Sequence, residues 1–331
     1  MKSMALAALL MLGASSCAST ARNTTDPLHG RTIVLDPGHG GTAATDNYRV
    51  GPAGEREEWI NLRVALILRD LLEARGVRVL LTRSADTDVP LRARADLARD
   101  SAADAFISIH HNATADPAVN FPIIYYHGYA SANEAGVALA RHLARHLTQA
   151  LFADTVEPSV VSDHVIFAGS GTAVLRHSYG IPGVIGEATF FTNPDEERRL
   201  RDAVHNRREA EAYVRALHDF FSEPRPPVRP ASTVAPPERF ETAQEAERMS
   251  DVARRWREDY EEGRRLMEGP GRDLDRAYEL LTRSARNFPD SPVARDAHLL
   301  RARILDAWGR ATEAGEVRRR VEEFHAGVGA G

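Results

Sequence analysis

The 331-residue sequence contains a single cysteine, Cys17, and a single lysine, Lys2. One cysteine cannot form a disulfide within the chain, and it cannot supply the several thiolates of a cysteine-rich metal site. The formal net charge is only −5, so the chain lacks the strongly basic field that a nucleic-acid partner requires. These shortages exclude a disulfide-stabilised scaffold and predict no nucleic-acid binding.

Long apolar runs are also scarce, and the one of most interest lies at the N-terminus. The run MALAALLMLGA follows Lys2 and has the length of a signal peptide, too short to span a bilayer as a permanent helix. Cys17 comes directly after it in ASSC, which resembles a bacterial lipobox. We expect residues 1–17 to be a signal peptide whose Cys17 is lipidated. The alternative is that Cys17 leaves with the signal.

A lipobox predicts an envelope protein held to a membrane by lipid. Ala18 follows the cysteine where inner-membrane retention would favour Asp, so an outer-membrane lipoprotein facing the periplasm is expected. Without lipidation the protein would be periplasmic or secreted. At 331 residues the chain has room for about two domains.

Four polar residues stand where apolar runs end or begin: His39, Glu57, His110 and Glu187. Three of them close strand-like runs and Glu57 opens a helical one, so an α/β fold would place them at one edge of its sheet. Two His and one Glu are a ligand set for a catalytic zinc with an open position, and the remaining carboxylate can then act as base. Residue types alone leave the alternative of hydrogen-bonded loop residues open.

Five motifs with matching order and spacing make the chain, from about residue 31 to 221, resemble the zinc-dependent N-acetylmuramoyl-L-alanine amidases of the type called amidase 3. They are LDPGHGG (35–41), EEWINLRVAL (57–66), LTRSADTDVPLRAR (81–94), ADAFISIHHNA (103–113) and AVLRHSYGIPGVIGEATFFTNPDE (173–196). The resemblance implies hydrolysis of the amide between N-acetylmuramic acid and L-Ala in peptidoglycan. It also implies one zinc ion per chain.

Residue by residue, the resemblance makes His39, Glu57 and His110 the zinc ligands and Glu187 the catalytic carboxylate. The chain departs from the family pattern after Glu187, where Ala188-Thr189 replaces the usual Gly. Glu57 and His110 each have a neighbour of the same residue type that could take their place. Glu58 is expected to be solvated because it points about 100° away from Glu57 on a helix. Strand periodicity does not choose between His110 and His111, and only the family match favours His110.

The order of elements predicts an α/β fold with a largely parallel sheet, covered by helices on both faces, and a small all-α C-terminal region. Strands are expected at 32–35, 77–82, 105–109, 123–126 and 183–188. Helices are expected at 57–75, 91–100, 132–151 and 194–221. The segment SVVSDHVIFAGSGT is expected to be irregular. No second amphipathic helix stands out between Asn112 and Gly186, so the chain is not expected to block its own active site.

The domain organisation follows from composition. We expect a short tether at 18–30, a catalytic domain at 31–221, a proline-rich linker at 222–239, a helical region at 240–326 and a flexible tail at 327–331. The helical region resembles tetratricopeptide repeats, with room for about two units. It is either a small bundle that extends the domain or a module for a protein partner. Since no candidate site residue follows Glu187, deleting 240–331 is expected to leave hydrolysis largely intact.

Other polar residues are weaker candidates. Arg83, Asp86 and Arg94 favour a structural ion pair over a substrate clamp. His164 and His177 are candidates for the cleft wall, and His127 is either packed or solvated. Two alternatives to the amidase remain: an inactive or regulatory peptidoglycan-binding lipoprotein that recruits another hydrolase, and a zinc peptidase acting on free peptides.

Overall fold

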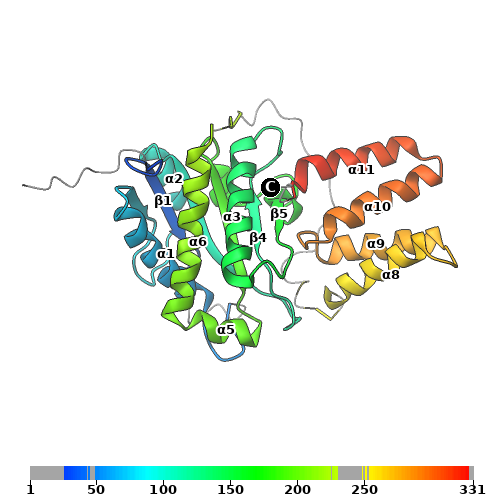
Figure 1. Ribbon diagram of the computed structural model, residues 1–331, viewed down its shortest axis with the longest axis horizontal. Coiled ribbons are helices and arrows are strands. Elements are labelled where there is room, and N and C mark those ends of the chain that lie inside the picture. The colour runs from blue at the N-terminus through cyan, green and yellow to red at the C-terminus, as the bar shows by residue number, and fades with distance from the viewer. Residues whose placement is uncertain are drawn as a thin grey trace, which may run out of the picture.

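The computed structural model describes residues 26–42, 44, 49–224, 226–229, 248, 250–251 and 253–327. Its described part contains a six-stranded sheet with the order β2-β1-β3-β6-β4-β5 (Figure 1). The strands are β1 (Thr32–Pro37), β2 (Arg78–Leu81), β3 (Ala105–Asn112), β4 (Ile123–Tyr126), β5 (Ser159–Ser162) and β6 (Gly183–Phe190). Neighbouring strands are parallel except β4 and β6, which are antiparallel. The predicted α/β fold with a largely parallel sheet is confirmed.

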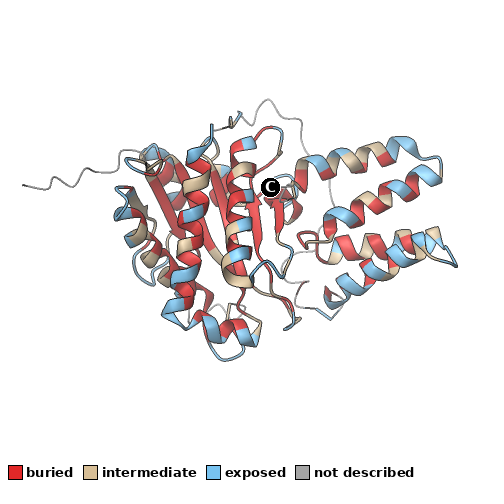
Figure 2. Ribbon diagram, in the orientation of Figure 1, coloured by how far each residue is buried: buried red, intermediate tan, exposed pale blue. Residues whose placement is uncertain are grey.

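The register of the central strands sets up the site. β1 pairs with β3 so that Pro37 lies opposite Ile109, and β3 pairs with β6 so that His110 lies opposite Glu187. The carboxyl ends of these three parallel strands therefore meet at one edge. β1, β3 and β6 are almost wholly buried (Figure 2), as expected for central strands of a parallel sheet with both faces covered.

One face of the sheet is covered by α1 (Glu57–Glu73), α3 (Glu134–Phe152) and α6 (Ala203–Ser222) (Figure 1). Helix α1 buries Ile60, Val64, Leu68 and Leu72, which recur every four residues and so form one apolar stripe. The chain leaves α1 through Gly76, whose φ of 79° suits glycine. Ile33, Leu35, Ile107 and Ile109 point into the same core from the strands.

The opposite face is covered by α2 (Leu91–Asp100), α4 (Ala173–His177) and residues of the C-terminal region. That region contains α8 (Trp256–Glu268), α9 (Leu274–Asn287), α10 (Ala294–Ala307) and α11 (Ala311–Phe324). Trp256, Phe288 and Phe324 belong to the same buried cluster as Phe121 and Phe190 of the α/β part. The rings of Phe121 and Phe288 lie 6.1 Å apart between centroids, and those of Phe121 and Trp256 lie 6.2 Å apart.

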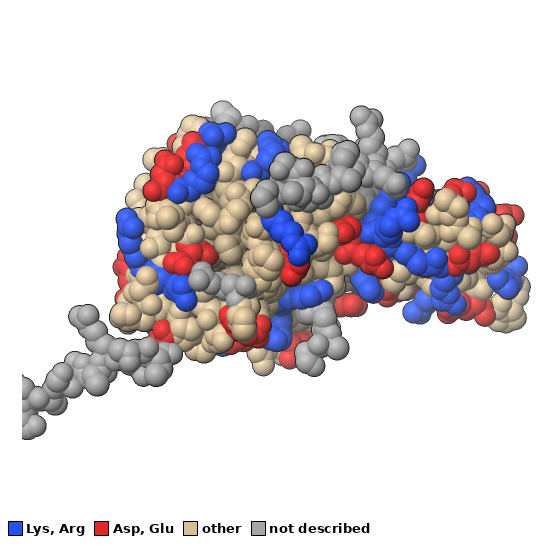
Figure 3. Space-filling model, turned by 90° about the horizontal axis from the view of Figure 1, so that it is seen from above, with Lys and Arg blue, Asp and Glu red and all other residues tan. Residues whose placement is uncertain are grey.

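The shared core bears on whether the C-terminal region is a separate module or extends the α/β domain. Trp256, Phe288 and Phe324 share a core with the α/β part, as expected if the helices extend the domain. That deletion of 240–331 leaves hydrolysis largely intact stays a prediction. The hydroxyl of Tyr126 also donates to the carbonyl of Glu323 at 2.8 Å, and the backbone N–H of Ala130 donates to the same carbonyl at 3.1 Å. The outer surface of the region carries interspersed positive and negative side chains (Figure 3), many in i,i+3 pairs.

Three local features differ from the sequence expectations. β5 forms within the segment that reads as irregular, because the short run SVVS pairs in parallel with β4. The helix at 173–177 was not expected. The closing helix expected at 194–221 is divided into α5 (Pro194–Leu200) and α6, because the side chain of Asp202 accepts from the N–H of Val204 and starts a new helix.

The N-terminal and linker predictions fall largely on residues that the structure does not describe. Residues 1–25, with Cys17 and most of the tether, lie outside the described residues, as do residues 230–247, which include much of the linker. Among the described helices, none is both long and apolar enough to cross a membrane. The likeness of 240–326 to tetratricopeptide repeats stays a prediction.

Candidate active site

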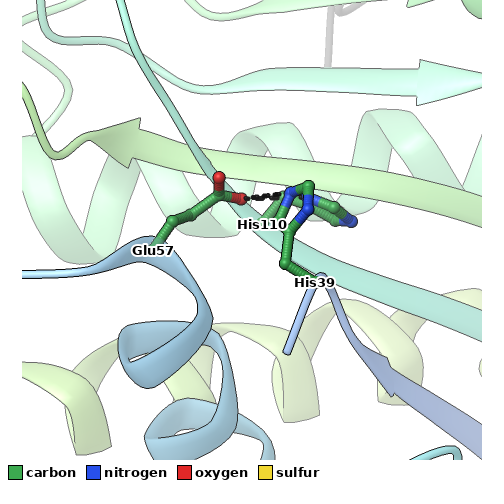
Figure 4. A group of neighbouring side chains, drawn as sticks. All are labelled: His39, Glu57 and His110. Carbon is green, nitrogen blue, oxygen red and sulfur yellow. Dashed lines mark hydrogen bonds and ion pairs between the residues drawn. The ribbon is translucent and has the colours of Figure 1, made fainter. Parts of the chain in front are cut away.

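Three side chains meet beside the ends of β1 and β3: His39, Glu57 and His110 (Figure 4). Oε1 of Glu57 lies 3.1 Å from Nε2 of His39 and 3.0 Å from Nδ1 of His110. The two imidazole rings are nearly perpendicular, at 85°, with centroids 4.7 Å apart. Their ligand atoms all lie within 4.8 Å of one another. Two imidazole nitrogens and a carboxylate thus converge on a single point.

The turn after β1 presents His39 in an uncommon backbone conformation. His39 has a φ of 59°, and Gly40 and Gly41 that follow also have positive φ; a non-glycine residue there is strained and is held by its surroundings. Gly38 is equally constrained, because a Cβ at that position would lie 2.2 Å from Cε1 of His110. The glycine therefore permits the ring of His110 to lie against the turn that carries His39.

Two buried arginines hold this turn in place. Arg83 donates to the carbonyls of Pro37 and Gly38, each at 2.8 Å. Arg94 pairs with Asp36 at 2.9 Å and donates to the carbonyl of His39 at 2.7 Å. Both contact backbone at the site, and the ion pair is formed by Arg94 with Asp36 rather than with the expected Asp86. Asp86 also supports the turn by accepting from the N–H of Gly41 at 2.7 Å.

A second layer of hydrogen bonds orients Glu57. The side-chain amide of Asn61 donates to Oε1 of Glu57 at 3.2 Å, and its carbonyl oxygen lies 2.8 Å from Nδ1 of His111. Nε2 of His111 in turn lies 3.1 Å from Glu209 on α6. His111 is therefore a supporting residue behind Glu57, and His110 is the histidine of the convergent group.

Burial and neighbouring charge set the protonation of the group. Burial lowers the pKa of His39, helped by the charges of His110 and Arg49, although Glu57 opposes the change. Burial alone would raise the pKa of Glu57, but the charge of His39 and hydrogen bonds from both histidines hold it well below its usual value. Its place in the first turn of α1 also favours the anion. A neutral His39 and an ionised Glu57 are the forms that bind a metal.

Glu187 shares a cavity with these three residues. It lies directly opposite His110 in the parallel register, so both side chains leave the same face of the sheet. The register between β3 and β6 shifts directly beyond this pair, at the Ala188-Thr189 departure. The cavity has a volume of about 640 Å³, and its wall includes Asp36, Tyr125, Ile166, Phe167 and Arg248.

Comparison with known proteins decides between the chemistries that this arrangement allows. Residues 33–219, more than half of the chain, match the family model Amidase_3, described as N-acetylmuramoyl-L-alanine amidase. The chain belongs to this amidase family. Its function is therefore that of a cell-wall amidase, which hydrolyses the amide between N-acetylmuramic acid and L-Ala in peptidoglycan.

Individual relatives agree with the family match. N-acetylmuramoyl-L-alanine amidase AmiA of Escherichia coli is 27% identical over 226 residues, which cover 58% of this chain and 76% of that protein. A probable cell wall amidase of Staphylococcus aureus, LytH, is 30% identical over 204 residues, which cover 60% of each chain.

Two solved structures are also similar. The amidase AmiC2 of Nostoc punctiforme has 29% identity and a TM-score of 0.50, with 58% of this chain and 98% of that chain covered. The CwlD amidase of Clostridioides difficile, solved in complex with the GerS lipoprotein, has 25% identity, the same TM-score and the same coverage.

Two other residues singled out in the sequence, Glu58 and His177, lie outside the cavity. Glu58 is wholly buried and pairs with Arg56 at 2.8 Å, so the expectation that it is solvated was wrong. Arg83 donates to the backbone carbonyl of Glu58, so this side of α1 is also covered by protein. His177 lies near Arg92, 3.3 Å from its Nη1, and is not part of the cavity wall.

His127, Asp163 and His164 form a second buried group of possible ligands. Asp163 is fully engaged, because it accepts from Nδ1 of His127 at 2.9 Å and from the N–H and hydroxyl of Thr172 at 2.7 and 2.8 Å. These bonds fix the segment 166–174 that lines the cavity. His127 is thus a packed histidine, and His164 stacks on Phe324 rather than facing the cavity.

Proposed function

We propose that the amidase is zinc-dependent, with His39, Glu57 and His110 as the ligands of one zinc ion and Glu187 as the catalytic carboxylate. The observation that carries the proposal is the convergence of two imidazoles on Oε1 of Glu57, at 3.1 and 3.0 Å, in the cavity that also contains Glu187. Convergent ligands next to a spare carboxylate are what metal-assisted amide hydrolysis requires.

The donor set fits zinc. Two His nitrogens and one Glu oxygen are a known catalytic zinc set that leaves one position open, and the chain offers no thiolate in this group. The ligands are also supported from behind, since Asn61 and His111 orient Glu57. When bound, zinc lowers the pKa of a bound water to about 7 and polarises a carbonyl group.

Glu187 would carry out the proton transfers. As a carboxylate on the wall of the cavity, it accepts a proton from the attacking water and returns it to the leaving amine of L-Ala. Its position opposite His110 is fixed by the pairing of two central strands, so no loop movement is needed to bring it to the site. Arg83 and Arg94 keep His39 oriented during this cycle through the backbone of the turn.

Metal loading tests the zinc proposal. We expect the purified chain to contain about one zinc ion, to lose hydrolysis of purified sacculi after chelation, and to regain it with zinc. Metal analysis and the release of stem peptides from sacculi are the measurements. A metal-free preparation with full activity would contradict the proposal. Cleavage of free stem peptides but not of sacculi would favour the zinc peptidase alternative.

The alternative of an inactive or regulatory lipoprotein predicts no hydrolysis of sacculi at any zinc concentration. The presence of all four site residues in one cavity argues against it.

A protein partner is a separate proposal. The complex of CwlD with the GerS lipoprotein suggests a partner for this amidase as well, and the outer helices of 240–326 are the surface that we propose for it. Pull-down with residues of α10 and α11 altered would test that surface.

We also propose that the amidase is an envelope lipoprotein anchored through Cys17, facing peptidoglycan in the periplasm. The support is the apolar run before ASSC. A single acyl chain binds membranes only marginally, so more than one is required. Cys17→Ser is expected to move the protein from the membrane fraction to the soluble fraction. An unchanged distribution after cell fractionation would contradict lipidation.

A further inference from the structure

Of the residues beyond α6 that the structure describes, one lines the catalytic cavity, Arg248. Arg248 lies outside residues 33–219, which match the amidase family, so the family match does not account for it. It lines the same cavity as His110 and Glu187 although its exposed fraction is only 3%. A buried cation in a catalytic cavity requires an explanation, because burying a charge is costly unless it is paired.

Arg248 is held in position through both its backbone and its guanidinium. Its backbone carbonyl accepts from the N–H of Ala115 at 3.2 Å and from the hydroxyl of Thr114 at 3.3 Å, both in the loop after β3. Its guanidinium lies over the ring of Phe288, with Cζ 5.0 Å from the ring centroid. The residue is therefore held in place by the α/β part on one side and by the C-terminal helices on the other.

Asp290 and Tyr125 hold the charge. Nη2 of Arg248 donates to Oδ2 of Asp290 at 2.5 Å, and the hydroxyl of Tyr125 donates to the same carboxylate. Burial would lower the pKa of Arg248, but Asp290 and Tyr125 outweigh it and raise the pKa. The guanidinium is consequently permanently charged at the cavity.

The ion pair does not use the whole guanidinium. Of the guanidinium nitrogens, only Nη2 donates to Asp290, and Nε of Arg248 is buried with no hydrogen-bond partner among the described residues. An unmade hydrogen bond of a buried donor is unfavourable, and such donors are usually satisfied by a ligand or water. The ion pair with Asp290 accounts for Nη2 of Arg248, but it does not account for the place of this residue in the cavity wall.

We propose that Arg248 forms a subsite that binds a carboxylate of the stem peptide, on the peptide side of the scissile amide. The inference rests on the amidase activity of the family and on the catalytic site proposed above. The stem peptide carries an acidic residue directly after L-Ala, and guanidinium N–H groups form charge-assisted bonds to carboxylates. The C-terminal helices would then take part in substrate selection by completing the wall of the cavity.

Two soluble substrates test the subsite in the full-length enzyme. Both are N-acetylmuramoyl peptides, one with a free α-carboxylate on the second residue and one with that group as the amide. We expect wild-type kcat/KM to be roughly tenfold or more higher for the carboxylate, as for one hydrogen bond to a charged group. Inactivity on both would overturn the amidase function and the subsite with it. Equal kcat/KM on both would overturn the subsite alone.

The variant Arg248→Gln completes the test. It is expected to raise KM for the carboxylate substrate about tenfold, leave the amide substrate nearly unchanged, and so remove the preference. The preference is a ratio measured on one preparation, so a reduced folded fraction cancels. The matched control is Arg276→Gln, an exposed arginine of α9 that pairs with Glu279 and should keep the wild-type preference. An Arg248→Gln enzyme with the full preference would contradict the subsite.

Discussion

Glu187→Gln is expected to lower kcat on sacculi by roughly 10²- to 10⁴-fold, the usual contribution of a general base. The amide has nearly the same shape as the carboxylate, but it cannot accept a proton from the attacking water. His39, Glu57 and His110 keep their contacts, so zinc content should stay at the wild-type value. Metal analysis and steady-state rates on the same preparation are the measurements.

A control accounts for the change in net charge. Glu134 lies in the first turn of α3, and its side chain is 44% exposed, so Glu134→Gln should keep the full rate. If Glu187→Gln hydrolysed sacculi at near the wild-type rate, another residue of the cavity would have to act as the base.

The convergence of the site was predictable because it depends on strand ends. His39, His110 and Glu187 follow or end apolar runs, and parallel strands bring their carboxyl ends to one edge. The sequence could not choose between His110 and His111, since period-2 alternation places them on opposite faces without saying which face holds the site. That choice depends on Asn61 and Glu209, which engage His111 from two different helices.

The wrong expectations for β5 and Glu58 also have physical causes. β5 reads SVVS, with only two apolar residues between polar ones, whereas the equally short β4 reads IIYY and is apolar throughout. Glu58 is buried with Arg56 as the partner of its carboxylate, 2.8 Å away, and a helical wheel does not contain this contact.

The contacts of the C-terminal helices with the α/β part could not be predicted from the sequence. Phe288 and Trp256 pack on Phe121, and Arg248 reaches the cavity. Contacts between residues more than a hundred positions apart leave no local signal, and the proline-rich segment suggested a boundary instead. The sheet face that these helices cover is apolar, so the α/β part and the helices stabilise each other.

His110→Ala is expected to abolish both zinc binding and hydrolysis. His110 supplies one of only three proposed ligands, and no neighbouring imidazole can replace it, because His111 is committed to Asn61 and Glu209. Loss of a supporting residue typically weakens metal binding or activity by roughly 10- to 100-fold, and loss of a ligand should cost more. Zinc should fall from about one per chain to near zero after dialysis.

The fold should survive this change, which makes the result interpretable. His110 is partly exposed at the cavity rather than in the core, and its removal relieves the tight contact with Gly38. Circular dichroism should therefore match the wild type. The matched control is His177→Ala, a histidine outside the cavity wall, which should keep zinc and activity. Full zinc content in His110→Ala would contradict the ligand assignment, and the simultaneous loss of zinc and activity in His110→Ala but not in His177→Ala would tie the chemistry to the convergent group.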